Sequence, residues 1–286
     1  MSTLPTHREL LKAGISRLEA AGIDGGREDA RFLLFEAAGI PYGEFIMCEH
    51  DPVDAGTVSA FEAMIERRLN REPVSLIIGH TDFMGLSFLT DGRALAPRGD
   101  SERLVEMALA LTADRPEGRI VDLGTGSGCL ILSFLSERPG WTGTGLDLSP
   151  DALSLTRENA GRLGLGDRLT LIEGSWAAAE VVLAEADLVI SNPPYIVSDV
   201  IDTLDPEVRN HDPMLALDGG ADGLTAYRDI IALCEKVLSP GKPLLFEIGY
   251  DQADAVTGLL SGQSFAELEV GKDFSGHNRV VKGIRL

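Results

Sequence analysis

From about residue 97 onward the sequence alternates between short apolar runs and stretches of helical periodicity, and this alternation limits the fold more than any other feature. The apolar runs lie at 119–123, 143–148, 169–172, 186–191 and 243–248. The helical stretches include 101–113, 128–137, 150–163 and 224–238. Strands separated by helices in this way form a parallel sheet with helices on both faces. We therefore expect an open, Rossmann-like α/β sheet, which two last strands at 266–272 and 278–285 close as a hairpin, one strand running antiparallel.

The residues before this region have a different pattern. Apolar side chains recur at helical spacing in 6–72, and glycines interrupt them, which predicts a small helical bundle. Residues 73–96 contain Asp91-Gly92 and aromatic residues, and they predict a short β-hairpin linker. The expected domains are therefore 1–72, 73–96 and 97–286. The bundle carries no recognisable chemistry, so a packing module and a partner-binding module are both open.

Composition excludes several classes of protein. The net charge is −20, whereas proteins that bind nucleic acid stably usually present a cationic surface to the phosphates. The most basic stretch, 66–72, carries its own acidic residues and is typical of a solvated helix face. No apolar run approaches the roughly 20 residues that span a bilayer, so we expect no contact with a membrane.

The cysteines and the first residues indicate the compartment. Cys48, Cys129 and Cys234 are far apart and odd in number, so they suggest neither a disulfide framework nor a metal site. Residues 1–7 lack the basic and apolar segments of a signal peptide. A reducing, cytoplasmic location is expected, with no bound metal, and nothing in the sequence requires more than a monomer.

A glycine loop follows the first strand of the α/β region. Gly124, Thr125, Gly126, Ser127 and Gly128 lie between the apolar run at 119–123 and the start of a helix. Glycines allow a ligand to approach the backbone closely, and a helix N-terminus offers free N–H donors. The dinucleotide pattern G-x-G-x-x-G would need glycine where Cys129 stands. The spacing instead suits a nucleoside that carries an amino acid.

Two residues at the ends of the next strands extend this site. Asp147 ends the second strand, where a carboxylate can accept hydrogen bonds from both ribose hydroxyls. The alternative for Asp147 is a helix cap, which Ser149 or Asp151 can supply instead. Trp176 follows the third strand and can lie along an adenine face, although a lone Trp is often a core residue.

Asn192, Pro193, Pro194 and Tyr195 follow the fourth strand and are the most specific motif. In an open α/β sheet, ligands bind outside the carboxyl ends of the strands. Two prolines remove two backbone donors and fix the chain path, leaving carbonyl acceptors, the Asn192 amide and the Tyr195 ring. Such a turn can accept hydrogen bonds from a planar NH2 group beneath an aromatic ring. It therefore indicates methylation of an amide or amino nitrogen, while a merely rigid loop is the alternative.

These motifs together resemble the class I S-adenosylmethionine-dependent methyltransferases that modify planar amino groups. Four further segments resemble one family among them, the bacterial peptide chain release factor glutamine methyltransferases of the HemK/PrmC type. These segments are 71–74, the linker from 78 to 106 (at Ile78-Gly79, Phe83-x-Gly85-x-x-Phe88 and 97–106), 216–224 and 247–252. The match covers nearly the whole chain. It departs from the usual family pattern at Leu76, Gly99 and Ser175, where the family commonly has Tyr, Pro and Asp.

The resemblance implies a reaction and its residues. The cofactor is S-adenosylmethionine, and the substrate is the glutamine of the Gly-Gly-Gln motif in class 1 release factors. Asn192 Oδ1 and the Pro193 carbonyl accept the two amide hydrogens, Tyr195 packs on the amide plane, and Pro194 shapes the turn. The glycine loop, Asp147, Trp176 and Asn192 hold the cofactor.

Other functions remain open from the sequence alone. A different translation protein can supply the glutamine. An adenine amino-methyltransferase would use the same Asn-Pro-Pro-Tyr turn, although the acidic charge argues against it. A cofactor-binding adaptor without catalysis is a third alternative, which the intact turn disfavours.

Overall fold

The computed structural model describes residues 4–41 and 43–286 and divides the chain into two compact units. The first unit contains residues up to 79 together with 206–211, and the second contains 80–205 and 212–286. The expectation that residues 1–7 carry no signal peptide falls partly on 1–3, which lie outside the described residues. Within the described ranges, none of the helices has the length and apolar character that a membrane span requires.

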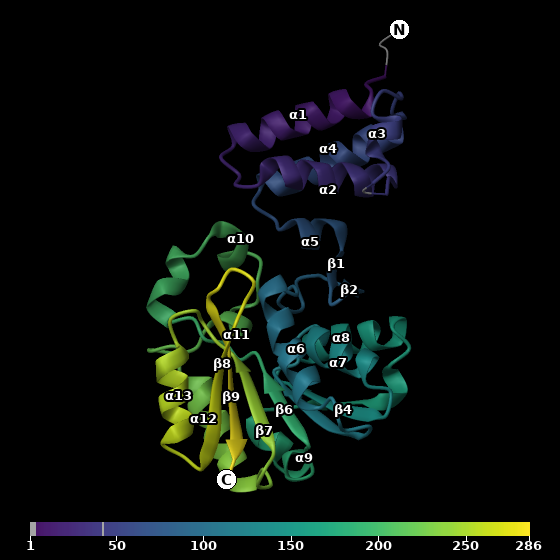
Figure 1. Ribbon diagram of the computed structural model, residues 1–286. Coiled ribbons are helices and arrows are strands. Elements are labelled where there is room, and N and C mark those ends of the chain that lie inside the picture. The colour runs from purple at the N-terminus through teal and green to yellow at the C-terminus, as the bar shows by residue number, and fades with distance from the viewer. Residues whose placement is uncertain (1–3, 42) are drawn as a thin grey trace. The chain divides into compact units, whose positions relative to one another are not determined.

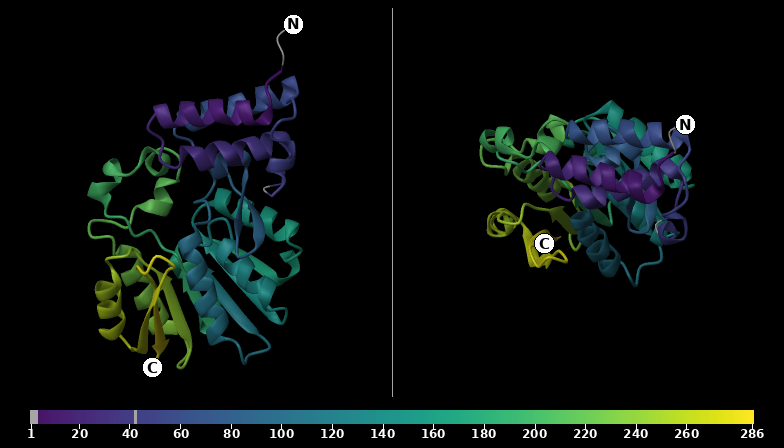
Figure 2. Two further views of the ribbon diagram at one scale, coloured as in Figure 1. Left: turned by 45° about the horizontal axis from the view of Figure 1, so that its top comes forward. Right: turned by 90° about the horizontal axis from the view of Figure 1, so that it is seen from above.

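The first unit is helical (Figure 1). Its helices are α1 (His7–Ala20), α2 (Gly26–Ala38), α3 (Phe45–Cys48), α4 (Ala55–Leu69), α5 (Val74–Ile78) and α10 (Pro206–Arg209). The long helices α1, α2 and α4 contact one another, and Figure 2 shows them gathered in the purple and blue part of the chain. The apolar side of each faces the same core, where Leu18, Leu33 and Phe61 are fully buried.

Local signals in the sequence fix the helix ends. Thr6 and Glu9 form a capping box at the start of α1, in which each side chain bonds the other residue's backbone N–H. Asp54 caps α4 by accepting hydrogen bonds from the N–H groups of Gly56 and Thr57 at 2.8 and 3.0 Å. Gly14 lets α1 approach α4 closely, because a Cβ there would lie 2.5 Å from the Phe61 ring.

A buried arginine ties α10 into the first unit. Arg68 is 6% exposed, and its guanidinium donates to Asp29 Oδ2 at 2.7 Å and to Glu207 Oε1 at 2.9 Å. Arg71 lies 3.4 Å from the same Glu207 oxygen. Burial raises the pKa of Asp29, so its carboxylate depends on Arg68 for compensation.

The second unit contains a two-stranded hairpin and a seven-stranded sheet. Its strands are β1 (His80–Phe83), β2 (Leu86–Leu89), β3 (Gly118–Leu123), β4 (Trp141–Asp147), β5 (Leu169–Glu173), β6 (Leu188–Ser191), β7 (Pro243–Glu247), β8 (Phe265–Lys272) and β9 (Asn278–Arg285). Its α-helices are α6 (Glu102–Leu111), α7 (Cys129–Glu137), α8 (Pro150–Arg162), α9 (Glu180–Ala184), α11 (Met214–Leu217), α12 (Thr225–Val237) and α13 (Ala253–Ser261). Short 3-10 helices are η1 (Gly99–Ser101), η2 (Gly166–Arg168), η3 (Trp176–Ala179) and η4 (Ser198–Thr203).

The sheet has the strand order β5-β4-β3-β6-β7-β9-β8. Strands β3 to β7 pair in parallel, whereas β9 runs antiparallel to both β7 and β8. Figure 1 shows β8 and β9 as the yellow pair beside β7. The predicted α/β class, with a mostly parallel sheet and an antiparallel final strand, is confirmed.

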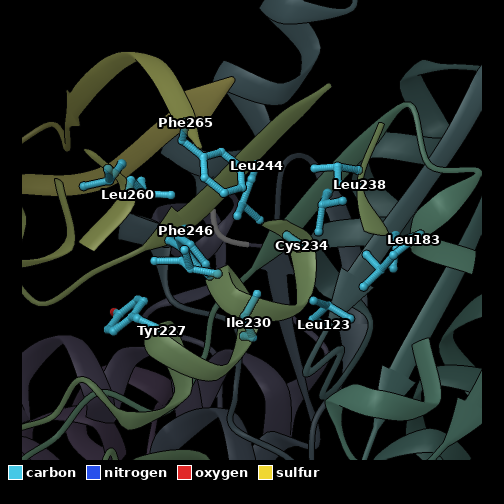
Figure 3. Close-up of a cluster of buried hydrophobic side chains, with 14 of the residues drawn as sticks. Leu123, Leu183, Tyr227, Ile230, Cys234, Leu238, Leu244, Phe246, Leu260 and Phe265 are labelled. Carbon is cyan, nitrogen blue, oxygen red and sulfur yellow. The ribbon is translucent and has the colours of Figure 1, made fainter. Parts of the chain in front are cut away.

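Alternate residues of the central strands face two separate cores. Helices α9, α12 and α13 pack on the face that carries Val121 and Phe246, and Figure 3 shows this cluster with Tyr227 and Ile230 of α12 against β7. Helices α6, α7 and α8 pack on the other face, which carries Ile120 and Leu245. Both faces of the sheet are therefore covered by helices, so a functional site is expected at the ends of the strands.

The segment 73–96, expected to be a hairpin linker, begins with the helix α5 and continues as the hairpin β1–β2. Phe83 and Phe88 are buried in the core beneath α6 and α7. Asn159 of α8 joins the hairpin to this core, because its side chain accepts from Leu89 N at 2.8 Å and donates to Leu89 O at 3.3 Å. The hairpin thereby carries residues 93–98 to the carboxyl edge of the sheet.

We expect Arg68→Ala to destabilise the first unit by about 2–3 kcal/mol, near the low end for breaking a buried ion pair, because both carboxylates keep some exposure. Amide hydrogen exchange in α2 and α4 should become faster by about two orders of magnitude.

Arg8→Ala is the control, because Arg8 is 64% exposed and 3.8 Å from Glu49. It should cost under about 1 kcal/mol. Both tryptophans, Trp141 and Trp176, lie in the second unit, so their fluorescence reports that unit separately. Equal exchange rates in the two variants would contradict the assigned role of Arg68.

Candidate functional site

The carboxyl ends of β3, β4 and β6 lie level with one another. Leu123 is paired with Leu146 of β4 and with Ser191 of β6. The residues that follow these three are Gly124, Asp147 and Asn192. Three strands that are separate in sequence therefore deliver a glycine loop, a carboxylate and an amide to one edge of the sheet.

The glycine loop is tied to β4 through backbone hydrogen bonds. The N–H groups of Gly124 and Thr125 both donate to Leu146 O, at 2.8 and 2.9 Å. Gly128 has φ of +81°, and a Cβ there would lie 2.7 Å from Thr156 Cγ2. Only glycine fits this position, which lets the chain turn directly into α7.

Asp147 is oriented before any ligand binds. Its Oδ2 accepts from Gly126 N and its Oδ1 from Ser149 N, both at 2.9 Å. The cap of α8 is Ser149, whose hydroxyl accepts from Ala152 N at 3.2 Å. Asp147 is therefore not needed as the helix cap. It lines a pocket, and its carboxylate keeps lone pairs that can accept further hydrogen bonds.

A pocket opens over the glycine loop, and we call it the loop pocket. Eight of the residues that the sequence predicted for the site line this pocket. They are Gly124, Thr125, Gly126, Ser127, Asp147, Trp176, Asn192 and Pro194. Sequence reasoning named no cofactor role for the other lining residues, which are Arg93, Ala94, Leu95, Ala96, Pro97, Arg98, Ser101, Cys129, Leu130, Leu148, Ser149, Ala152, Pro213, Leu215 and Ala216. Gly128, Pro193 and Tyr195 do not line it.

The walls of the loop pocket differ in character. Trp176 lies close to the loop, since a Cβ on Gly124 would be 3.5 Å from its ring. Leu148 and Leu215 are 55% and 51% exposed and make apolar walls. Arg98 donates to the buried carboxylate of Asp212 at 2.8 Å, which fixes the chain next to Pro213 and Leu215. The pocket therefore combines apolar surfaces with one carboxylate and a backbone-lined end.

Two segments distant in sequence, 217–219 and Gln252, hold the chain at the end of the Asn-Pro-Pro-Tyr turn. Tyr195 O accepts from Gln252 Nε2 at 3.0 Å, Ile196 N donates to Leu217 O at 3.0 Å, and Gly219 N donates to Ile196 O at 2.8 Å. A Cβ on Gly219 would lie 2.7 Å from Tyr195 Cα. The glycines of 218–223 thus allow this segment to pack directly on the backbone of the turn.

Two buried acids near this edge have perturbed ionisation. Burial raises the pKa of Asp122 to about 7, although Thr125 donates to it at 2.8 Å. Burial also raises the pKa of Glu247, at the end of β7, to about 7. Sequence reasoning assigned neither a role. The available signal was an acidic residue within or at the end of a predicted strand, as at Asp147.

The chain matches two family models. One is described as the PrmC N-terminal domain and covers residues 9–79, and the other is described as the methyltransferase small domain and covers residues 102–204. A relative from Caulobacter vibrioides named release factor glutamine methyltransferase is 42% identical over 273 residues, which cover 96% of this chain and 94% of the relative. A relative of the same name from Rhodospirillum rubrum is 44% identical over 95% of this chain and 83% of its own length.

Solved structures agree with the fold. The hMettl16 catalytic domain, in complex with the MAT2A 3'UTR hairpin 6, has a TM-score of 0.56 at 15% identity. The match covers 70% of this chain and 76% of that one. At this identity the likeness concerns the fold alone.

We expect Gly219→Ala to lower the melting temperature by about 2–8 °C, because overpacking against backbone costs roughly 1–3 kcal/mol. Amide exchange at 195–198 should become faster. Gly258→Ala is the matched control, since a Cβ on this glycine of α13 meets nothing within 4 Å. Helix propensity predicts that the control is neutral or stabilising. A Gly219→Ala protein as stable as the control would show that the close contact is not required.

Proposed function

We infer, because the chain belongs to the family of release factor glutamine methyltransferases, that it transfers a methyl group from S-adenosylmethionine to the side-chain amide nitrogen of a release factor glutamine. The observation that carries this inference is the shared edge of the sheet, where the Asn-Pro-Pro-Tyr turn adjoins the loop pocket. We take the glutamine to be that of the Gly-Gly-Gln motif in class 1 release factors.

The residues of the loop pocket fit S-adenosylmethionine. The carboxylate of Asp147 is an acceptor for ribose hydroxyls, and Trp176 and Leu148 offer apolar surface to the base. The backbone of Gly124–Gly128, with positive φ at three glycines, leaves room where side chains would stand. When bound, the cofactor supplies an electrophilic methyl group on a sulfonium. Asn192 lines the same pocket, so it lies between the cofactor and the approaching substrate in this proposal.

The proposed catalysis is mainly positioning. An amide nitrogen is a weak nucleophile because its lone pair is delocalised, and its proton becomes acidic only after the methyl group is attached. No strong base is therefore needed beforehand, and orientation supplies most of the rate enhancement. Asn192 Oδ1 and the Pro193 carbonyl accept the two amide hydrogens, which turns the nitrogen toward the methyl group. Tyr195 packs on the amide plane, and Pro194 holds the shape of the turn.

The partner and the location follow from the same inference. The partner is a protein, which suits a chain with a net charge of −20 better than nucleic acid does. Cys48, Cys129 and Cys234 are free thiols, which suits the cytoplasm. The proposed working form is a monomer.

Tritiated S-adenosylmethionine with purified release factor tests the reaction. Label should enter the wild-type factor and not a factor whose Gly-Gly-Gln glutamine is changed to alanine. Asn192→Ala should lower transfer by about two to three orders of magnitude, as loss of one preorganised group at a reacting centre does. Its binding of S-adenosylhomocysteine should weaken far less than transfer does, because the glycine loop, Asp147 and Trp176 still hold the cofactor in this proposal.

Asn210→Ala is the control for this substitution, since Asn210 is exposed and lies outside the loop pocket. Near-normal transfer by Asn192→Ala would refute the role of Asn192. Equal labelling of the two release factors would move the methylated residue elsewhere.

Asp147→Ala should raise the Kd for S-adenosylmethionine by about 10- to 100-fold, because hydrogen bonds to a charged acceptor are worth roughly 1.5–3 kcal/mol. The control is Asp151→Ala, an exposed acid in the first turn of α8. Calorimetric titration gives both constants. Equal affinity in the two variants would show that Asp147 does not hold the cofactor.

A further inference from the structure

The row of residues at the carboxyl edge of the sheet continues onto β7. Ser191 of β6 is paired with Phe246 of β7 in the parallel register. The residues that follow are Asn192 and Glu247, so the two lie level on neighbouring strands. The Phe246 side chain belongs to the core under α12, and alternation along the strand turns the Glu247 side chain to the opposite face.

Glu247 is enclosed by the groups that shape the Asn-Pro-Pro-Tyr turn. It is 3% exposed, and its Oε1 lies 3.5 Å from the Tyr195 hydroxyl. Its backbone carbonyl accepts from the Tyr227 hydroxyl at 2.9 Å, which fixes the end of β7. The side chains of Ser101 and Asn192 lie near enough to its carboxyl group to act on its ionisation.

One oxygen of this carboxyl group lacks a partner. Among the described residues, Glu247 Oε2 is buried and accepts no hydrogen bond. Arg279, a cation that acts on the ionisation of Glu247, already binds Asp100 at 3.0 Å and Asp273 at 3.2 Å. An unpaired buried carboxylate destabilises the folded protein. Its position beside the Asn-Pro-Pro-Tyr turn therefore suggests that Glu247 has a functional role.

We propose that Glu247 is a positioning residue, whose carboxylate holds the Nδ2 group of Asn192 so that Asn192 Oδ1 faces the substrate amide. This proposal rests on the function proposed above for Asn192. An ionised carboxylate only accepts hydrogen bonds, so it can face Nδ2 of an amide but not Oδ1. A protonated carboxyl group can donate to Oδ1, which would turn the amide round and occupy the acceptor that the substrate needs.

The Glu247 carboxyl group titrates near neutrality, whereas the neighbouring groups Tyr195, Tyr227, Cys129 and Arg279 do not. Burial raises its pKa to about 7, with Asp100 adding to the rise and Ser101, Arg279 and Asn192 opposing it. Burial raises the pKa of Tyr195 and Tyr227 well above neutrality, and that of Cys129 to about 12, so all three stay uncharged. Arg279 stays charged, since its pKa is raised further. The competent state of Glu247 is the ionised one, so activity should rise with pH through about 7.

The first test observes Asn192 directly. In protein labelled with 15N-asparagine, the Asn192 side-chain signal is identified by its loss in Asn192→Ala. In the wild type this signal should shift with a midpoint near pH 7, and in Glu247→Gln it should not. A signal that is insensitive to pH in the wild type, or that titrates equally in Glu247→Gln, would overturn the proposal. This experiment needs no release factor, so it separates failure of this proposal from failure of the proposed function.

The second test measures kinetics with release factor. Glu247→Ala should lower kcat by about 10- to 100-fold, the range for loss of a partner that orients a functional group, with little change in the KM for S-adenosylmethionine. Glu247→Gln should recover most of this loss, because its Oε1 can still accept from Asn192, and its kcat should lose the inflection near pH 7. Glu269→Gln is the control, an acid on β8 that is 55% exposed.

Asp122 also titrates near neutrality, beneath the glycine loop. Its effect should appear in cofactor binding, so kcat is measured at saturating S-adenosylmethionine. An inflection near pH 7 that persists in the kcat of Glu247→Gln would overturn the assignment to Glu247. Full activity of Glu247→Ala would do the same.

Discussion

The parallel register of four adjacent strands is the constraint on which the rest of the site depends. Leu146, Leu123, Ser191 and Phe246 lie level across β4, β3, β6 and β7, so the next residue of each strand falls on one line at the edge of the sheet. Those residues are Asp147, Gly124, Asn192 and Glu247. A slip of one residue in any strand would reverse its side chains and break the line. The apolar cores on both faces prevent such a slip.

The buried acids at this edge of the sheet lower the stability of the folded protein by an amount that depends on pH. Asp122 and Glu247 are buried acids whose native pKa values are raised to about 7 by burial. The native state therefore binds their protons more tightly than the unfolded chain does. Their contribution to stability is present at low pH and is lost as pH rises through the interval up to about 7. The ionised state proposed for catalysis is thus the less stable one, and the apolar packing around Tyr227 and Phe246 must compensate for it.

Much of this edge could be predicted from sequence because its signals are local. The apolar run before Asn192 and the two prolines after it are contiguous, as are β3 and the glycine loop. Other features depend on contacts distant in sequence. Val74–Ile78 is rich in β-branched residues, yet it is helical because it packs against the helical core. Gly219 is explained by its contact with Tyr195, which no spacing rule reveals. Glu247 lies in an apolar run, and its proposed role becomes visible only from its neighbours in the fold, Tyr195 and Asn192.

Residues 206–211 belong to the first unit, so the first unit cannot be removed by a single cut in the chain. The chain passes between the two units three times, at 79–80, 205–206 and 211–212, instead of once. A truncation that starts at residue 80 would keep Glu207 and discard Arg68, and it would leave Glu207 without this partner on the segment that follows the Asn-Pro-Pro-Tyr turn. If such a fragment were inactive, the cause could be disturbance of the segment around Glu207 as readily as loss of a substrate-binding surface on the helical unit. The N-terminal family model ends at residue 79, whereas the folded unit also includes 206–211, so the two boundaries differ.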